Sequence, residues 1–267
     1  MTDRFRALSI AGSDPGGGAG IQADLKTFHA FGVFGTSAVT AVTAQNTLGV
    51  RAVHPIPVAV VRAQIDAVIE DIPPQAVKSG MLATRPLVEA VADALRGLGL
   101  AYVLDPVLVA TSGDRLLEAD AEAALSRLLL PLATVVTPNL HEARILTGRE
   151  IGTVEDARAA ARQLVDMGAG AALVKGGHLA GSEAVDLFWD GAEERIWRRP
   201  RLDTRHTHGT GCTLSAAVAA GLARGRPLSE AVDRAVDFVA RAIAEAPGLG
   251  AGHGPLNHFV PAVPPDA

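Results

Sequence analysis

The stretch from residue 7 to residue 28, ALSIAGSDPGGGAGIQADLKTF, indicates the fold class of this chain. Residues 7–11 form a short apolar run, and residues 12–20 form a glycine-rich turn. Apolar Ile21, Leu25 and Phe28 then follow at the spacing of one helix face. A buried strand, a tight turn and an amphipathic helix in this order predict the first half of a βαβ unit.

The same alternation continues along the chain. Further short apolar runs, typical of strands buried on both faces, lie at residues 37–42, 76–79, 102–104, 134–137 and 171–175. Helical periodicity follows at residues 88–95, 157–164, 214–222 and 231–243. Residues 184–189 and 195–200 flank Asp190 and Gly191, which predicts a β-hairpin. The pattern therefore predicts one α/β domain over residues 1–267, with a mostly parallel sheet and helices on both faces.

Composition excludes several classes of protein. Of 267 residues, 48% are hydrophobic and 20% are charged, so we expect a large core rather than disorder. The net charge of −5 and the aromatic content of 4% argue against nucleic-acid binding as the main activity. The single cysteine, Cys212, cannot form an internal disulfide and indicates a reducing, cytoplasmic location. The N-terminal apolar run is too short for a signal peptide, and residues 30–50 are too polar for a membrane span.

Ligands of such sheets lie beyond the carboxyl ends of the strands. In this chain the expected strands are followed by residues 12–14, 45–46, 80–81, 105–106, 138–139 and 176–177. These positions are rich in glycine and polar side chains, which predicts a shared site along that edge. The glycine-rich residues 12–20 match neither the dinucleotide fingerprint nor the Walker phosphate loop, so a flexible turn with a helix cap is the alternative there. Asp24, one turn into the helix, faces a ligand or favours the helix dipole.

A second glycine-rich segment, HGTGCT at residues 208–213, precedes a helical run. The amides of Thr210, Gly211 and Cys212 are expected at a helix N-terminus, where donors and dipole favour an anion. A helix start also lowers a thiol pKa, which would make Cys212 reactive; the alternative is a core cysteine. His206 and His208 lack an evident third metal ligand, so we expect them to be solvated or to anchor the loop.

Two carboxylates and one lysine follow other strands. Asn139 and Glu142, in the segment TPNLHE at residues 137–142, share a face if a helix begins there. Glu142 would then cap the helix or hold magnesium through water. Asp105 is a second candidate carboxylate. Lys175 ends an apolar strand, where lysine is rare unless its ammonium reaches solvent or a phosphate.

These motifs, in this order, resemble the ribokinase-like superfamily, and within it the hydroxymethylpyrimidine/phosphomethylpyrimidine kinases of thiamine biosynthesis. The resemblance covers residues from about 7 to 245, and its most specific parts are residues 11–27 and 208–213. The remaining parts are residues 40–46, 77–81, 104–107, 137–142 and 173–178. The resemblance implies a three-layer α/β/α fold that uses ATP and Mg²⁺. It implies phosphorylation of 4-amino-5-hydroxymethyl-2-methylpyrimidine and then of its monophosphate, in a homodimer.

The resemblance also implies residue roles. The pyrimidine pocket would be lined by Gly12, Ala19, Asp24, Gln45, Met81 and Val107, with Gln45 bonded to the ring nitrogen and amino group. Gly209, Thr210, Gly211 and Cys212 would form the catalytic anion hole, with Cys212 as the base. Lys175, Asn139 and Thr207 would contact ATP, and Asp105 and Glu142 would hold magnesium, directly or through water. The nearest alternative is a pyridoxal/pyridoxine kinase; a non-catalytic metabolite sensor and a dinucleotide oxidoreductase are more distant.

Overall fold

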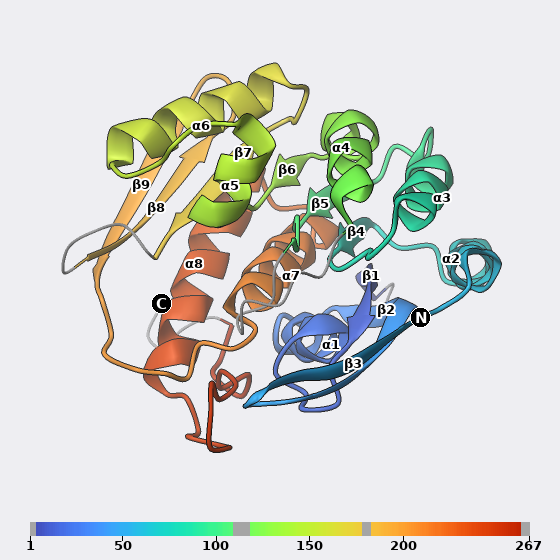
Figure 1. The fold of residues 1–267 in the computed structure, drawn as a ribbon, viewed down its shortest axis with the longest axis horizontal. Helices are drawn as coiled ribbons and strands as arrows, with labels where there is room; N and C mark the ends of the chain where they lie inside the picture. Colours follow the sequence, from blue (N-terminus) through green and yellow to red (C-terminus); the bar gives the residue numbers. More distant parts are fainter. Residues whose placement is uncertain (1–3, 109–117, 178–182, 263–267) are drawn as a thin grey trace.

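The computed structural model describes residues 4–108, 118–177 and 183–262. One sheet runs through the molecule in the order β3-β2-β1-β4-β5-β6-β7-β8-β9 (Figure 1). Its strands are β1 (Arg6–Ser13), β2 (Phe34–Asn46), β3 (Gly49–Pro55), β4 (Ala76–Ser79), β5 (Ala101–Leu104), β6 (Val135–Val136), β7 (Ala172–Gly176), β8 (Glu183–Trp189) and β9 (Glu194–Pro200). The neighbouring strands β2, β1, β4, β5, β6 and β7 pair in parallel. Strand β3 pairs antiparallel with β2, β8 pairs antiparallel with β7, and β9 pairs antiparallel with β8.

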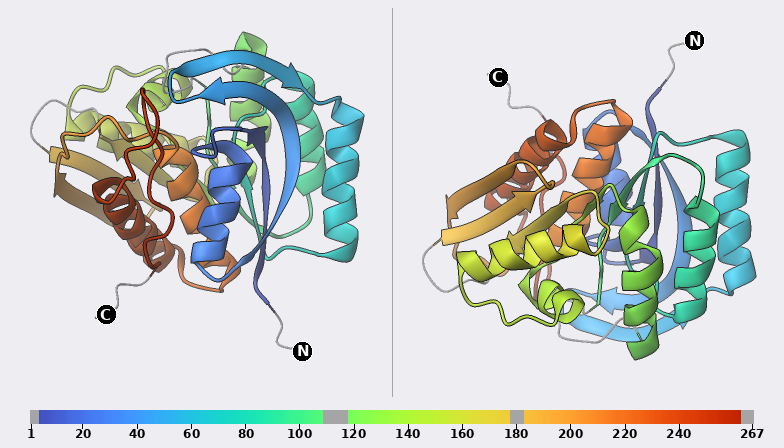
Figure 2. Two further views of the ribbon diagram at one scale, coloured as in Figure 1. Left: turned by 90° about the horizontal axis from the view of Figure 1, so that it is seen from below. Right: turned by 90° about the horizontal axis from the view of Figure 1, so that it is seen from above.

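Helices cover both faces of this sheet (Figure 2), which confirms the predicted α/β fold with helices on either side. One face carries α1 (Gly20–Ala30), α7 (Thr210–Ala223) and α8 (Leu228–Ala244), and the other carries α2 (Val58–Asp71), α3 (Arg85–Leu95), α4 (Ala119–Leu128), α5 (Leu140–Thr147) and α6 (Val154–Asp166). A short 3₁₀ turn, η1 (Leu130–Leu132), follows α4. Each face has its own apolar cluster, because buried parallel strands present side chains to both sides. Within the described residues, no helix is both long and apolar enough to cross a bilayer.

The main difference from the sequence analysis is the hairpin of β2 and β3. Strand β2 begins earlier and ends later than residues 37–42, and β3, which pairs with it from Gly49 to Pro55, carries no apolar run. Most side chains of β3 are exposed at the sheet edge, so burial imposes no pattern on them. Helices α2 and α4 were also not anticipated. Strand β6 is only Val135–Val136, shorter than residues 134–137.

Candidate active site

The first glycine-rich loop is held in shape by Asp14. Its carboxylate accepts hydrogen bonds from the backbone amides of Gly16 (2.8 Å), Gly18 (3.1 Å) and Ala19 (2.9 Å). Burial alone would raise the pKa of this carboxyl, but His208 and the Gly16 and Ala19 amides hold the pKa below its ordinary value. Asp14 therefore stays charged and fixes the loop that leads into α1.

His208 connects this loop to the second glycine-rich segment. Its Nε2 lies 2.9 Å from Asp14 Oδ2 and 3.1 Å from Gln45 Nε2. Thr43 Oγ1 is 3.3 Å from the other end of the Gln45 amide. The histidine therefore anchors the loop, which is one of the two alternatives expected from the sequence, and its ring lies beside Gln45, a predicted pyrimidine-binding residue. The chain separation between Asp14 and His208 explains why sequence reasoning missed this contact.

Gly209 lets the two loops touch. It is the N-cap of α7 with φ at 83°, and a Cβ built there would lie 1.7 Å from the carbonyl oxygen of Gly18. Thr210 donates its amide to the Thr207 carbonyl (3.2 Å), so one predicted anion-hole donor is already used. Within the described residues, the amides of Gly211 and Cys212 have no backbone or side-chain acceptor. These two amides are the donors that remain for an anion.

Cys212 differs from its expected electrostatics. Burial raises the pKa of its thiol to about 11, and the Asp105 and Asp24 carboxylates act in the same direction. Lys78 and the Gly20 amide oppose the shift but do not cancel it. The expectation that the helix start lowers this pKa is therefore wrong. A helix dipole contributes little beside desolvation and two nearby negative charges.

Asp105, Glu142 and Lys175 come together as predicted. Lys175 Nζ lies 3.2 Å from Asp105 Oδ1 and 4.0 Å from Glu142 Oε2, between β5, α5 and β7. Burial lowers the pKa of Lys175, but the two carboxylates outweigh it and raise the pKa overall, so the ammonium stays charged. A Cβ on Gly211 would lie only 2.9 Å from Lys175 Nζ. The Lys175 ammonium therefore lies beside Gly211, at the start of α7 where the free amides are.

Asp105 is also contacted by hydroxyl groups. Thr137 Oγ1 donates to Asp105 Oδ1 (3.4 Å), and Ser215 Oγ lies 3.3 Å from Asp105 Oδ2, although the Gly211 carbonyl at 2.9 Å is the nearer acceptor for its one hydrogen. The carboxylate is almost completely buried. It therefore points in one direction, beneath Lys175.

Glu142 takes the first of its two expected roles, the cap of α5, while its role in holding magnesium stays a prediction. Asn139 is the N-cap of α5; its side chain accepts the Glu142 amide (2.9 Å), and Glu142 Oε2 accepts the Asn139 amide (2.7 Å). Burial raises the pKa of Glu142 to about 7, while Lys175 lowers it and Asp105 raises it. The capping box thus holds this carboxylate beside Lys175, at a place where burial raises its pKa.

The donor set fits magnesium. Asp105 and Glu142 offer hard carboxylate oxygens, and Mg²⁺ commonly takes one or two carboxylates together with phosphates and water. Within the described residues, no group of three His, Cys, Asp or Glu side chains could enclose a metal.

Asp24 lies deeper than expected. Its carboxylate is fully buried, with Lys78 Nζ at 2.9 Å and Ser9 Oγ donating at 2.5 Å. Burial raises the pKa of Asp24 although Lys78 and Ser9 lower it. The Asp24 carboxylate is therefore not accessible to a ligand. It supports the site through its buried ion pair with Lys78. Sequence reasoning missed Lys78, whose signal was a lysine inside the apolar β4 run.

Three residues predicted to line the pyrimidine site lie close together. A Cβ on Gly12 would lie 3.2 Å from Met81 Sδ, and Val107 packs against the cluster formed by Met81, Ala41 and Ala83. Thr40 Oγ1 donates to the Met81 carbonyl (2.6 Å), which fixes the turn after β4. The structure thus brings Gly12, Met81 and Val107 to one place beside the glycine-rich loop.

All three lysines of the chain belong to this region, whereas its other basic residues are arginines or histidines. Lys26 Nζ donates to the Gly17 carbonyl (2.6 Å), Lys78 binds Asp24, and Lys175 binds Asp105. Compact ammonium groups therefore occur only where the glycine-rich loops and carboxylates meet.

The model of the phosphomethylpyrimidine kinase family matches residues 14–257. The chain belongs to this family. It is 57% identical over 258 residues to a hydroxymethylpyrimidine/phosphomethylpyrimidine kinase of Rhizobium meliloti, which covers 95% of this chain and 96% of that relative. The family membership confirms the predicted resemblance and the prediction of a small-molecule kinase.

Solved structures of the family and its neighbours share the fold. A phosphomethylpyrimidine kinase of Clostridium difficile superposes with a TM-score of 0.81 at 41% identity, covering 90% of this chain and 100% of that chain. An ADP complex of Bacillus subtilis pyridoxal kinase superposes with a TM-score of 0.89 at 40% identity, covering 96% and 98%. These likenesses confirm the predicted ribokinase-like architecture.

Proposed function

We propose that the chain phosphorylates 4-amino-5-hydroxymethyl-2-methylpyrimidine with ATP and then phosphorylates the monophosphate. The observation that carries this is the approach of Lys175 to Gly211, which places a cation, two carboxylates and two free amides at one point. The names of relatives such as the Rhizobium meliloti kinase supply the substrate class.

The pyrimidine would lie between the apolar cluster and Gln45. Gly12, Met81 and Val107 offer an apolar wall, and the Gln45 amide offers both a donor and an acceptor for the ring nitrogen and amino group. Ala19 closes the pocket through its backbone, which Asp14 holds. We place Asp24 behind this wall, where its pair with Lys78 stabilises the start of α1.

Phosphoryl transfer would occur at the start of α7. The alcohol oxygen attacks the γ-phosphorus, the bond from that phosphorus to the β–γ bridging oxygen breaks, and ADP leaves. The amides of Gly211 and Cys212 and the Lys175 ammonium stabilise the charge on the phosphoryl oxygens. The alcohol proton passes to Cys212 Sγ when that group is thiolate.

Two further groups would complete the nucleotide site. Asn139 and Thr207 flank the cluster on its α5 and α7 sides and are proposed to contact ATP. Magnesium, held by Asp105 and Glu142 directly or through water, would neutralise charge on the nucleotide phosphates. The ADP complex of the Bacillus subtilis pyridoxal kinase supports nucleotide binding by this fold.

Pyridoxal kinase is the second candidate, because the Bacillus subtilis pyridoxal kinase superposes more closely than the Clostridium difficile kinase. Higher sequence identity to a hydroxymethylpyrimidine/phosphomethylpyrimidine kinase favours the pyrimidine. A homodimer and a cytoplasmic location are retained as predictions; sedimentation of the purified chain and fractionation of cells test them.

A coupled assay of ADP release separates the candidates. Hydroxymethylpyrimidine, its monophosphate, pyridoxal and ribose are supplied in turn with ATP and magnesium. We expect the highest kcat/KM for the two pyrimidines. Preference for pyridoxal would replace the proposed substrate, and ADP release independent of any alcohol would remove the kinase proposal.

A further inference from the structure

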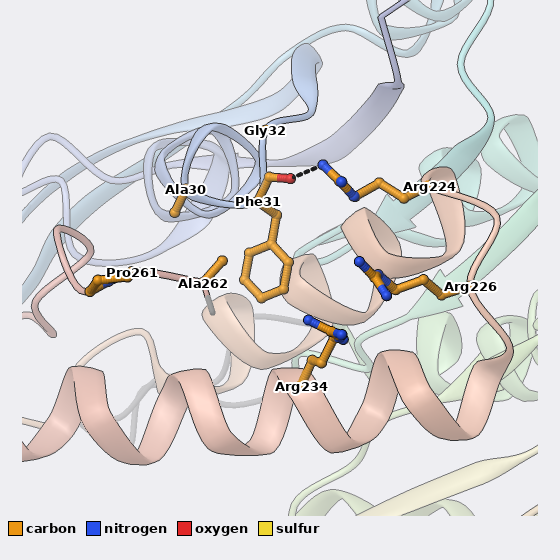
Figure 3. A pocket seen from close by; sticks show the side chains of 8 residues that line it. All are labelled: Ala30, Phe31, Gly32, Arg224, Arg226, Arg234, Pro261 and Ala262. Carbon is orange, nitrogen blue, oxygen red and sulfur yellow. Dashed lines mark hydrogen bonds between the residues drawn. The ribbon is translucent and has the colours of Figure 1, made fainter. Parts of the chain in front are cut away.

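A pocket lies at the C-terminal end of α7, whereas the proposed active site lies at the N-terminal end of that helix. Its volume is about 390 Å³, and it is formed where α1 ends, α7 ends and α8 passes the C-terminal segment (Figure 3). Helix α7 has Gly211 in its first turn and Arg224 as its C-cap. Its 14 residues separate the two ends by about 21 Å at 1.5 Å per residue. The pocket is therefore distinct from the proposed catalytic centre.

Three arginines line this pocket, and their charge is only partly balanced. Arg226 and Arg234 both bind Glu230, with Arg234 Nε at 3.0 Å from Oε1. Arg224 donates to the Phe31 carbonyl (2.8 Å), and within the described residues no carboxylate lies within ion-pair distance of it. Three guanidinium groups thus face one carboxylate. This excess positive charge stands out in a chain whose net charge is −5.

The walls of the pocket are held in place. The guanidinium carbon of Arg224 lies 5.2 Å from the Phe5 ring centre, a cation–π contact that orients it. The Phe31 ring packs edge-on against Phe238, with 5.1 Å between ring centres. Such prior ordering lowers the entropy lost when a ligand binds.

The C-terminal wall is fixed separately. Arg241 donates to the carbonyls of Pro261 (2.6 Å) and Ala262 (3.5 Å), which line the pocket opposite the arginines. Figure 3 shows these residues on one side of the Phe31 ring and the guanidinium groups of Arg226 and Arg234 on the other. One side of the pocket is therefore apolar and the other is cationic.

We propose that this pocket binds a small organic phosphate, with its phosphate group on the arginines and a compact apolar or aromatic body against Phe31, Pro261 and Ala262. Guanidinium groups match phosphate oxygens geometrically and remain charged at every physiological pH. The excess of two positive charges suits a phosphate dianion. This site is independent of the proposed catalytic reaction.

Phenyl phosphate, titrated by calorimetry, is the probe. The variants are Arg224→Gln and Arg234→Gln, and Arg62→Gln is the matched control because Arg62 is a surface arginine paired with Asp66 on α2. Glutamine at position 224 keeps a donor for the Phe31 carbonyl, and melting temperatures verify folding. We expect each pocket variant to bind at least tenfold more weakly, while Arg62→Gln binds like the wild type.

Lys175→Met separates the pocket from the active site, where phenyl phosphate could also bind. We expect pocket binding to survive in Lys175→Met and to weaken as sodium chloride is raised. Benzyl alcohol, the uncharged analogue, should show no binding that the two pocket variants weaken. Binding of phenyl phosphate that disappears in Lys175→Met but persists in both pocket variants would overturn the proposal, as would benzyl alcohol binding that equals that of phenyl phosphate and is weakened by both pocket variants.

Discussion

At the scale of single residues, the pKa of the Cys212 thiol should determine how kcat depends on pH. Its thiol pKa of about 11 means that only a small fraction is thiolate at neutral pH. If thiolate accepts the alcohol proton, kcat should rise almost tenfold per pH unit between pH 7 and pH 9, because the active form increases by that factor. Initial rates at saturating ATP and pyrimidine measure this profile.

Substitution of Cys212 tests the same role. We expect Cys212→Ala to lower kcat roughly 10²-fold with little change in KM, because a positioned base contributes at least this much. Cys212→Asp should retain more activity and lose most of the pH dependence, since a carboxylate is already ionised. Near-normal turnover in Cys212→Ala would remove the thiol from the mechanism.

Asp14 should matter for substrate binding more than for turnover. Asp14→Asn removes the charge that holds three loop amides and His208, so the loop and the imidazole ring beside Gln45 lose their fixed positions. We expect KM for the pyrimidine to rise roughly tenfold with a smaller change in kcat, as one charge-assisted hydrogen bond is lost. Asp190→Asn is the control, because Asp190 accepts two amides in the distant β8–β9 turn. An equal rise in KM for both variants would contradict this role.

At the scale of elements, the start of α7 depends on Gly209. Gly209→Ala would place a methyl group against the Gly18 carbonyl in a left-handed conformation. We expect it to lower the unfolding free energy by about 3 kcal/mol or more and to abolish most activity. Gly225→Ala has a similar φ of 73° with open space around it, so it should cost only about 1 kcal/mol. Denaturant unfolding compares them; equal losses would disprove the loop contact.

The C-terminal segment should make stability depend on pH. His258 Nε2 lies 3.0 Å from Thr213 Oγ1, and burial lowers the pKa of His258 to about 4, assisted by Lys26. Between about pH 6.5 and pH 4, the unfolded chain binds a proton that the folded chain does not, so the unfolding free energy falls as pH falls. The loss should approach about 2 kcal/mol after allowance for partial exposure.

Paired variants measure this contribution. His258→Gln should flatten the dependence of unfolding free energy on pH in that window, whereas His29→Gln, which changes an exposed histidine on α1, should leave it as in the wild type. Identical pH profiles for the wild type and His258→Gln would show that His258 is not the group responsible.

At the scale of the whole molecule, the sequence predicts the buried strands, because burial on both faces of the sheet requires apolar side chains. The apolar runs identify the parallel strands, and their carboxyl ends lead to Asp105, Glu142 and Lys175. Strand β3 is not predicted from the sequence, because most of its side chains are exposed and carry no apolar run. The Asp24–Lys78 pair and the Asp14–His208 contact join residues distant in the chain. The thiol pKa depends on burial and on carboxylates from β5 and α1, so a local motif could not predict it.

The central claim is that one site phosphorylates first the pyrimidine alcohol and then the phosphate group of the resulting monophosphate. Mass analysis of the products over time, with hydroxymethylpyrimidine, ATP and magnesium, tests it most directly. We predict that the pyrimidine first gains one phosphoryl group and that the monophosphate is then converted to the diphosphate. Accumulation of monophosphate alone, or recovery of unmodified pyrimidine, would contradict the account.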